Sequence, residues 1–274
     1  MNKKLMKVVE ILQNTSSLLV ISGSGISQES GIPTYRGNEG LYNDKKRMLH
    51  FSDLKNNPDK VWFAVDEMRR LIYDKKPNRG HQILSDWERS GMFSRFLIAT
   101  QNIDNLHQEA GSERVCEIHG NVWKLAQKKQ KSYAEDQEFN DELLLADYPE
   151  YEEEILKKWS EENGYDVWMD KQIFSTIPPE VSNDTRPHIH FFDELYNDKF
   201  LWVKDFAKRK VDTVLIIGCS GKVSALHIMI DCVKNYNQDS ILIDINCQNN
   251  NNRADVDLRG RAVDLLEEIS GFIK

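Results

Sequence analysis

Four short runs of apolar residues constrain the fold of this chain more than any other feature. They cover residues 18–21, 96–99, 214–217 and 241–245, and small or polar residues follow each run. Continuous apolar runs of this length are typical of strands buried on both faces of a sheet. Segments with helical periodicity alternate with them. The sequence therefore predicts an α/β fold, a Rossmann-like parallel sheet with helices on both faces.

The helical segments are visible from their spacing. The chain opens with Leu5, Val8, Val9 and Leu12 on one helical face. Residues 61–73 and 80–89 are predicted to form two further helices, and residues 258–266 are predicted to start a terminal helix. Gly260 in that terminal segment would allow close approach to a base or to another helix, and core packing is the alternative.

Length and charge set limits on function. The 274 residues suffice for one large domain, or for a large and a small one. The net charge is 36 − 44 = −8, so we expect no nucleic-acid partner, because phosphate binding needs a basic surface. An acidic surface suits lysine-rich peptides or simply maintains solubility.

No apolar run in the sequence is long enough to span a membrane. Lys7 and Glu10 interrupt the apolar run of a signal peptide, so we expect a cytoplasmic protein.

The segment 126–184 breaks the alternating pattern. It is strongly charged, with an acidic run at residues 152–154. It still carries large apolar residues, and helices are expected within residues 144–159. We interpret it as a small module inserted into a Rossmann-like domain made of residues 1–125 and 185–274. A disordered insert is the alternative, but a disordered segment seldom carries so many apolar residues: Leu143, Leu144, Leu145, Tyr151, Ile155, Leu156, Trp159 and Trp168.

A glycine-rich turn follows the first predicted strand. Gly23-Ser24-Gly25-Ile26-Ser27 lies between that strand and a predicted helix. Glycines at such a position let backbone N–H groups approach a pyrophosphate, and a helix N-terminus favours its charge. An ordinary tight turn has the same pattern. Arg36, just downstream, adds a cation to a phosphate-type loop, or is an incidental surface arginine.

Polar residues also follow the second predicted strand. Gln101, Asn102 and Asp104 offer amide and carboxylate groups at a strand end, where α/β sheets gather ligands. They could bind a carboxamide or a ribose. Alternatively, Asn102 and Asp104 cap the helix that follows.

His119 follows a short strand predicted at residues 115–118. An imidazole has an unperturbed pKa of about 6.5, so it can act as a base near neutral pH. A structural histidine is the alternative. That alternative is favoured for His50, His107 and His227.

Taken together, the ordered motifs resemble the sirtuin family of NAD-dependent protein deacylases. Residues 23–36 (GSGISQESGIPTYR) are similar to the family's Gly-Ala-Gly-x-Ser-x-x-Ser-Gly-Ile-Pro-x-Phe-Arg. The remaining matches are residues 77–81 (PNRGH), 100–107 (TQNIDNLH), 111–112 (GS), 117–120 (EIHG), 186–189 (RPHI), 192–194 (FDE), 218–220 (GCS) and 245–246 (IN).

The resemblance implies a reaction and a set of roles. NAD serves as co-substrate, and the partner is an acyl-lysine protein or peptide. The products are free lysine, nicotinamide and O-acyl-ADP-ribose. His119 matches the base, and Asn102 and Asp104 match the other catalytic residues. The cofactor-binding positions are Gly23, Ser24, Gly25, Ser27, Thr34, Tyr35, Arg36, Gln101, Asn102, Ile103, Asp104, Gly218, Cys219, Ser220, Asn246 and Ala262. The substrate-binding positions are His190, Phe191, Phe192, Asp193 and Glu194.

The sequence departs from the family in its metal site. Typical sirtuins carry two Cys-x-x-Cys pairs, whereas this chain has no cysteine from position 121 to position 217. A closed structural zinc site of this kind needs four thiolates. The sequence therefore predicts no metal and no structural zinc.

Two further departures concern the acylated substrate. Val65 and Met68 stand where desuccinylase-type members carry a Tyr-x-x-Arg pair, although Arg69 and Arg70 lie close by. Neither Val65 nor Met68 can bind a carboxylate, so we expect a neutral acyl group, with acetyl the default. In the substrate loop, His190, Phe191 and Asp193 stand where valine, tryptophan and glycine are usual.

Three functions remain open at this point. The retained His119 favours an NAD-dependent protein-lysine deacylase. The altered substrate loop and the insert motivate an ADP-ribosyltransferase or an NAD hydrolase instead. The third alternative is a non-catalytic NAD or ADP-ribose sensor. The oligomeric state does not follow from the sequence.

Overall fold

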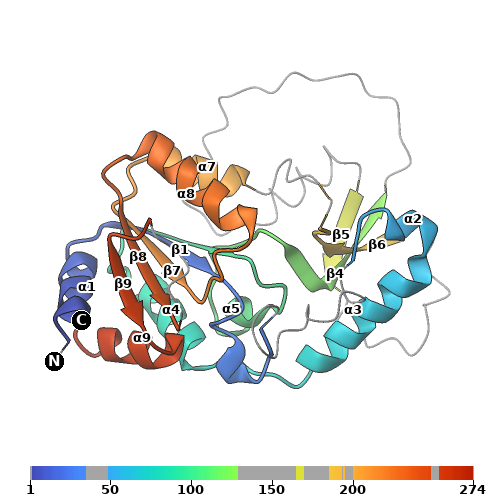
Figure 1. The fold of residues 1–274 in the computed structure, drawn as a ribbon, viewed down its shortest axis with the longest axis horizontal. Coiled ribbons are helices and arrows are strands. Elements are labelled where there is room, and N and C mark those ends of the chain that lie inside the picture. Colours follow the sequence, from blue (N-terminus) through green and yellow to red (C-terminus); the bar gives the residue numbers. More distant parts are fainter. Residues whose placement is uncertain are drawn as a thin grey trace.

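The computed structural model describes residues 2–34, 49–128, 165–169, 185–192, 194, 200–247 and 253–273. Its main feature is a six-stranded sheet in the order β3-β2-β1-β7-β8-β9 (Figure 1). All five neighbouring pairs are parallel, which confirms the predicted Rossmann-like parallel sheet. The strands are β1 (Ser17–Ser22), β2 (Arg95–Thr100), β3 (Val115–Glu117), β7 (Thr213–Ile217), β8 (Ile241–Asn246) and β9 (Val256–Arg259).

Helices cover both faces of this sheet (Figure 1). On one face lie α1 (Lys3–Gln13), α4 (Arg79–Ser90) and α9 (Ala262–Ser270), and on the other lie α7 (Leu201–Lys208) and α8 (Ser224–Tyr236). Successive side chains of a strand point to opposite faces. Leu18 and Val20 of β1 accordingly join the first apolar cluster, and Leu19 and Ile21 join the second. Burial on both faces explains why the strands read as unbroken apolar runs.

A second, antiparallel sheet lies beside the first. Its central strand is β4 (Gly120–Lys128), flanked by β5 (Tyr165–Met169) and β6 (Thr185–Ile189). The helices α2 (Asp53–Asn56) and α3 (Pro58–Ile72) lie next to it in Figure 1. The predicted boundary at residue 126 falls inside β4, and the division into a domain and an insert stays a prediction. Residues 143–159, with their predicted helices, lie outside the described residues.

Two predicted helices differ from the structure in their extent. The helix predicted after the glycine turn is a short 3₁₀ helix, η1 (Gln28–Ser30). Gly31 ends it with a left-handed φ of 82°, and Pro33 follows, so this turn cannot propagate. The tail segment is also two elements. Val256 and Leu258 alternate with more exposed residues in β9, and α9 begins afterwards at Ala262.

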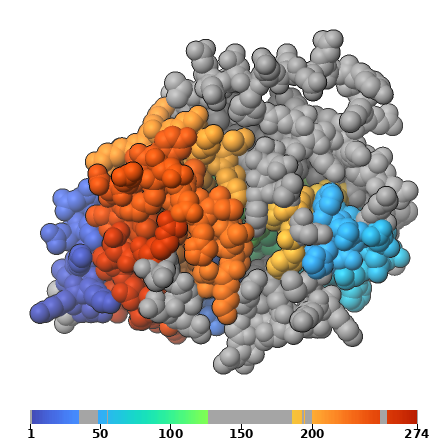
Figure 2. All heavy atoms as spheres, turned by 45° about the horizontal axis from the view of Figure 1, so that its top comes forward, coloured from blue at the N-terminus to red at the C-terminus, as the bar shows by residue number. Residues whose placement is uncertain are grey.

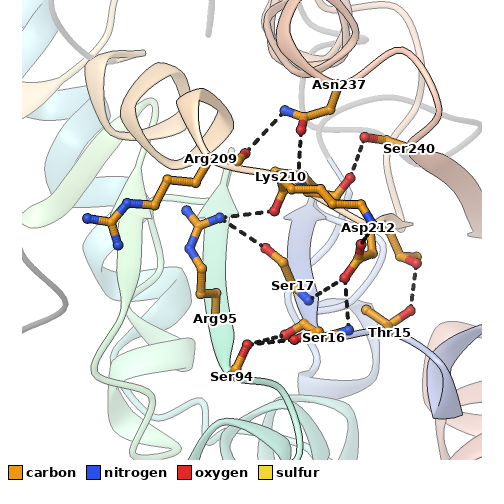
Figure 3. A network of polar contacts seen from close by, with 12 residues as sticks. Thr15, Ser16, Ser17, Ser94, Arg95, Arg209, Lys210, Asp212, Asn237 and Ser240 are labelled. Atoms are coloured by element: carbon orange, nitrogen blue, oxygen red, sulfur yellow. Dashed lines mark hydrogen bonds and ion pairs between the residues drawn. The ribbon is translucent and has the colours of Figure 1, made fainter.

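A polar network joins the amino ends of β1, β2 and β7 (Figure 3). One carboxylate oxygen of Asp212 accepts hydrogen bonds from the backbone N–H groups of Ser16 and Ser17, at 3.0 and 2.9 Å. Arg95 donates to the Ser17 hydroxyl at 3.3 Å and to the Lys210 carbonyl at 3.0 Å. These contacts fix the strands at the edge opposite the carboxyl ends.

Within the described part of the chain, no helix combines the length and hydropathy that a membrane crossing requires.

Candidate active site

The carboxyl ends of the parallel strands bring most predicted site residues to one edge of the sheet. Gly23 follows β1, Gln101 follows β2, His119 follows β3 and Gly218 follows β7, while Asn246 ends β8. Backbone hydrogen bonds cross between these ends, for example from the Gln101 N–H to the Ser22 carbonyl at 2.9 Å. In Figure 2, a small patch of green atoms lies recessed between orange and yellow atoms. Ligands of α/β sheets bind at such an edge.

Two glycines let the loops after β1 and β7 touch. The Gly25 N–H donates to the Gly218 carbonyl at 3.0 Å. A Cβ on Gly25 would lie 2.6 Å from the Gly218 Cα, and Gly218 has a left-handed φ of 62°. Both positions therefore require glycine. The result is a backbone cradle without side chains at the contact, which fits close approach of a pyrophosphate.

Polar side chains border this cradle. The Asn246 amide donates to the Cys219 carbonyl, and the Ser220 hydroxyl accepts from the Lys222 N–H at 3.4 Å. The Gln101 amide donates to the Cys219 sulfur at 3.3 Å. Burial raises the pKa of the Cys219 thiol, so this sulfur is a neutral packing group and not a nucleophile.

The hydroxyl of Ser27 links the two predicted catalytic residues of the β2 end. It donates to one carboxylate oxygen of Asp104 at 2.7 Å and accepts from the Asn102 amide at 3.0 Å. All three side chains are buried. Burial raises the pKa of Asp104. The other Asp104 oxygen accepts from the Leu106 N–H at 3.0 Å, so Asp104 also has the capping role weighed for it from the sequence.

Two buried histidines lie behind Ser27. His81 approaches the Ser27 hydroxyl with its Nε2 at 3.4 Å, and its ring meets that of His107 edge to face at 4.9 Å. Burial lowers the pKa of both, that of His107 to about 4, so both rings are neutral near pH 7. His107 Nε2 bonds the Ser22 hydroxyl at 2.8 Å. His81 is not among the predicted site residues, although the motif at residues 77–81 is a signal that identifies it.

His119 is held in one tautomer. Its Nδ1 lies 2.8 Å from the Gln101 carbonyl oxygen, which can only accept. Nδ1 therefore carries the proton, and Nε2 keeps its lone pair. In this tautomer the imidazole, placed at the ligand edge of the sheet, can act as a general base through Nε2.

Glu117 anchors the segment that carries His119. One of its oxygens pairs with Lys124 Nζ at 2.9 Å, and the other accepts from Gln108 at 2.7 Å and Asn121 at 2.6 Å. The Glu117 and Lys124 side chains are 7% and 9% exposed. This network joins β3, β4 and α5 (Leu106–Glu109), and no sequence motif predicts it.

The predicted substrate loop follows β6. Phe191 is buried, whereas Phe192 is exposed and donates its N–H to the Leu49 carbonyl at 3.2 Å. Glu194 forms a two-pronged ion pair with Arg186, at 2.7 and 2.9 Å, and accepts from the Phe191 N–H at 3.1 Å. These contacts tie Phe192 to Leu49, and Glu194 to Arg186 of β6.

The remaining predicted site residues are placed as follows. Ile103 is buried in the apolar cluster under α3, and Ala262 is buried in the main core at the start of α9. Thr34 is partly exposed, and Ser24 belongs to the turn after β1. Tyr35, Arg36 and Asp193 lie outside the described residues. No cluster of metal-ligating side chains occurs among the residues that the structure describes.

Comparison with known proteins agrees with this geometry. The family model described as "Sir2 family" matches residues 23–225. An NAD-dependent protein deacylase of Pyrococcus furiosus is 30% identical over 267 residues, which are 96% of this chain and 95% of that protein. One of Aquifex aeolicus is 45% identical over 111 residues, or 40% of this chain and 46% of that protein. The crystal structure of a Sir2 homolog–NAD complex superposes with a TM-score of 0.75 at 22% identity, covering 98% of this chain and 93% of that one, and shares the fold. This chain therefore belongs to the Sir2 family.

Proposed function

We propose that this protein is an NAD-dependent protein deacylase, which moves an acyl group from a lysine side chain to the ADP-ribose part of NAD and releases nicotinamide. The observation that carries the proposal is His119, a base-competent imidazole at the ligand edge beside Asn102 and Asp104. The name of the Pyrococcus furiosus relative, which aligns over nearly the whole chain, supports it.

The strand-end residues fit NAD. The Gly25–Gly218 cradle would receive the pyrophosphate, and Ser220 and Asn246 border it. NAD supplies the ADP-ribosyl group that accepts the acyl group. The buried Asn102 amide and Asp104 carboxylate are held by Ser27 at the ribose end.

His119 provides the proton transfer. Its Nε2 takes the proton from a hydroxyl of the ribose, while the Gln101 carbonyl holds the Nδ1 proton and fixes the ring. A positioned general base contributes ~10² to 10⁴-fold to a rate. Asp104 remains buried and oriented by two hydrogen bonds during this step.

A neutral acyl group is the proposed substrate class. Val65 and Met68 belong to the apolar cluster under α3. The two nearby cations are already engaged, because Arg69 donates to the Val122 carbonyl at 2.8 Å and Arg70 pairs with Asp66 at 2.7 Å. Faster turnover of succinyl-lysine than of acetyl-lysine peptides would contradict this assignment.

We also propose that the chain holds no structural zinc. The sequence has no cysteine between positions 121 and 217, whereas a closed site of this kind needs four thiolate ligands. Metal analysis of the purified protein should find far less than one zinc per chain, and one tightly bound zinc per chain would refute the proposal.

The function is tested by product analysis. Wild-type protein and His119→Ala are incubated with NAD and an acyl-lysine peptide library, and the products are identified by mass spectrometry. We expect O-acyl-ADP-ribose and deacylated peptide from the wild type, with a rate ~10² to 10⁴-fold lower for the variant. Nicotinamide release that needs no peptide would instead identify an NAD hydrolase or a transferase with another acceptor.

A further inference from the structure

A second imidazole lies beside His119. The His190 ring is nearly parallel to the His119 ring, with an interplanar angle of 14° and 6.0 Å between ring centroids. The His190 N–H donates to the His119 carbonyl at 2.9 Å, so the two rings are joined through the backbone as well. The His190 side chain is 4% exposed. These contacts hold two titratable rings at a fixed separation.

The surroundings of His190 contain one more ionisable pair. Its Nδ1 lies 3.8 Å from a carboxylate oxygen of Glu194. Arg186 partly neutralises that carboxylate through its two-pronged ion pair. Among the described residues, His119, Glu194 and Arg186 are thus the charged or titratable groups that the loop after β3, the substrate loop and β6 bring to His190. The carboxylate favours a proton on His190, whereas burial and a proton on His119 oppose it.

We propose that His190 is a positioning residue that keeps His119 in its neutral, proton-accepting form at acidic pH. The inference rests on the proposed function, because it concerns the same base. A proton on either ring disfavours protonation of the other, so a proton on His190 opposes protonation of His119. A second proton must then enter next to an existing charge.

The size of the effect follows from Coulomb's law. Two unit charges separated by the 6.0 Å between these rings should depress the second protonation by ~1 to 2 pH units at the effective dielectric of a partly buried site. The pair therefore titrates in two steps that belong to both rings. The acid limb of the activity profile should extend to lower pH than a lone histidine allows.

The test compares kcat/KM against pH for the wild type, His190→Phe and His190→Asn. Phenylalanine keeps a flat ring and removes the titration, and asparagine serves if the larger ring disturbs folding. We expect the midpoint of the acid limb to move up by ~1 pH unit in both variants. His50→Phe is the matched control, because His50 is an exposed histidine whose ring contacts Phe192 at 6.4 Å. Its profile should match that of the wild type.

A loss of activity that is equal at every pH would show a merely structural role for His190 and would overturn the proposal. A second readout separates this proposal from the deacylase assignment. In NMR titrations without NAD or peptide, the His119 imidazole should protonate ~1 pH unit higher in His190→Phe than in the wild type. An unchanged midpoint contradicts the pairing even if deacylation is confirmed. A raised midpoint supports the pairing even if no deacylation is found.

Discussion

At the scale of single residues, Ser27 connects the turn after β1 with the residues that follow β2, which lie far away in the sequence. Its buried hydroxyl reaches both Asp104 and Asn102, and His81 lies next to it. The oxygen thus serves as donor to a carboxylate and as acceptor from an amide. Removing it leaves a buried carboxylate oxygen without this donor, which is costly.

The first prediction concerns this hydroxyl. Ser27→Ala should lower kcat/KM for deacylation by ~10 to 100-fold, the equivalent of one charge-assisted hydrogen bond. Ser85→Ala is the control, because Ser85 is also buried, lies on the neighbouring α4, and its hydroxyl has no hydrogen-bond partner among the described residues. Steady-state kinetics of both variants decide the matter. Equal activities for the two would show that Ser27 does not position the site.

Single-residue candidates were predictable where a motif fixes them. His119, Asn102 and Asp104 stand at strand ends, and the structure places them at one edge of the sheet. The partners that orient them were not predictable, because Ser27 and Asp104 are 77 positions apart and their contact depends on strand order. The ion pair between Lys124 and Glu117 was not predictable either, because the two residues lie on different strands, β4 and β3.

At the scale of elements, two glycines decide how closely the β1 and β7 ends approach. Gly218→Ala would place its methyl group 2.6 Å from the Ile26 nitrogen. Gly91→Ala is the matched control, since Gly91 has a similar φ of 69° but nothing lies within 4 Å of its added Cβ. The comparison separates crowding from backbone strain.

We predict that Gly91→Ala costs ~1 kcal/mol of unfolding free energy, the usual cost of a left-handed non-glycine residue. Gly218→Ala should cost at least ~2 kcal/mol more, because packed backbone must move. Denaturant unfolding measures both values, and calorimetry should also show weaker NAD binding for Gly218→Ala. Similar losses for the two variants would mean that the close contact is dispensable.

The buried pair between Lys124 and Glu117 ties β4 to β3. Replacing Lys124 with methionine leaves the Glu117 carboxylate buried without its cation. Such changes lower the free energy of unfolding by ~3 kcal/mol or more. Arg70→Met, which breaks the exposed pair with Asp66, should cost only ~0.5 kcal/mol. Thermal and denaturant unfolding check the difference. Equal effects would argue against an anchoring role for Lys124.

Most elements followed from periodicity in the sequence. The apolar runs predicted β1, β2, β7 and β8, and helical spacing predicted α1, α3 and α4. β9 was missed because its four residues precede a helix and resemble its first turn. The second sheet was missed because β4 pairs with β5 across about 40 residues and with β6 across about 60, and no local pattern encodes such pairing.

At the scale of the whole molecule, buried ionisable groups make opposing contributions to stability. Burial lowers the pKa of His107 from 6.5 to about 4. Between pH 6.5 and about pH 4, the unfolded chain therefore binds a proton at this residue that the folded chain does not bind. His107 therefore destabilises the fold as the pH falls through this window. Burial raises the pKa of Asp244 from 3.8 to about 6, and this carboxyl has the opposite sign, because the folded chain binds the extra proton.

The corresponding prediction uses His107→Gln, which removes one of these groups. As the pH falls from above 6.5 to about 4, the unfolding free energy of the wild type should drop by about 3 kcal/mol relative to the variant, from a pKa difference of 6.5 − 4 = 2.5. For Asp244→Asn we expect the opposite trend: the unfolding free energy of the wild type, relative to this variant, should rise as the pH falls from about 6 to 3.8. Denaturant unfolding at several pH values measures both trends, and a pH-independent difference for His107→Gln would be inconsistent with a buried neutral ring.

We propose that NAD consumption in this protein is coupled to lysine deacylation. Its most direct test is the ratio of nicotinamide released to lysine freed, measured with NAD and an acetyl-lysine peptide. We expect one nicotinamide per deacylated lysine, no release when the peptide is omitted, and loss of lysine deacylation in His119→Ala. Nicotinamide release in excess of freed lysine, or release that persists without peptide, would contradict it.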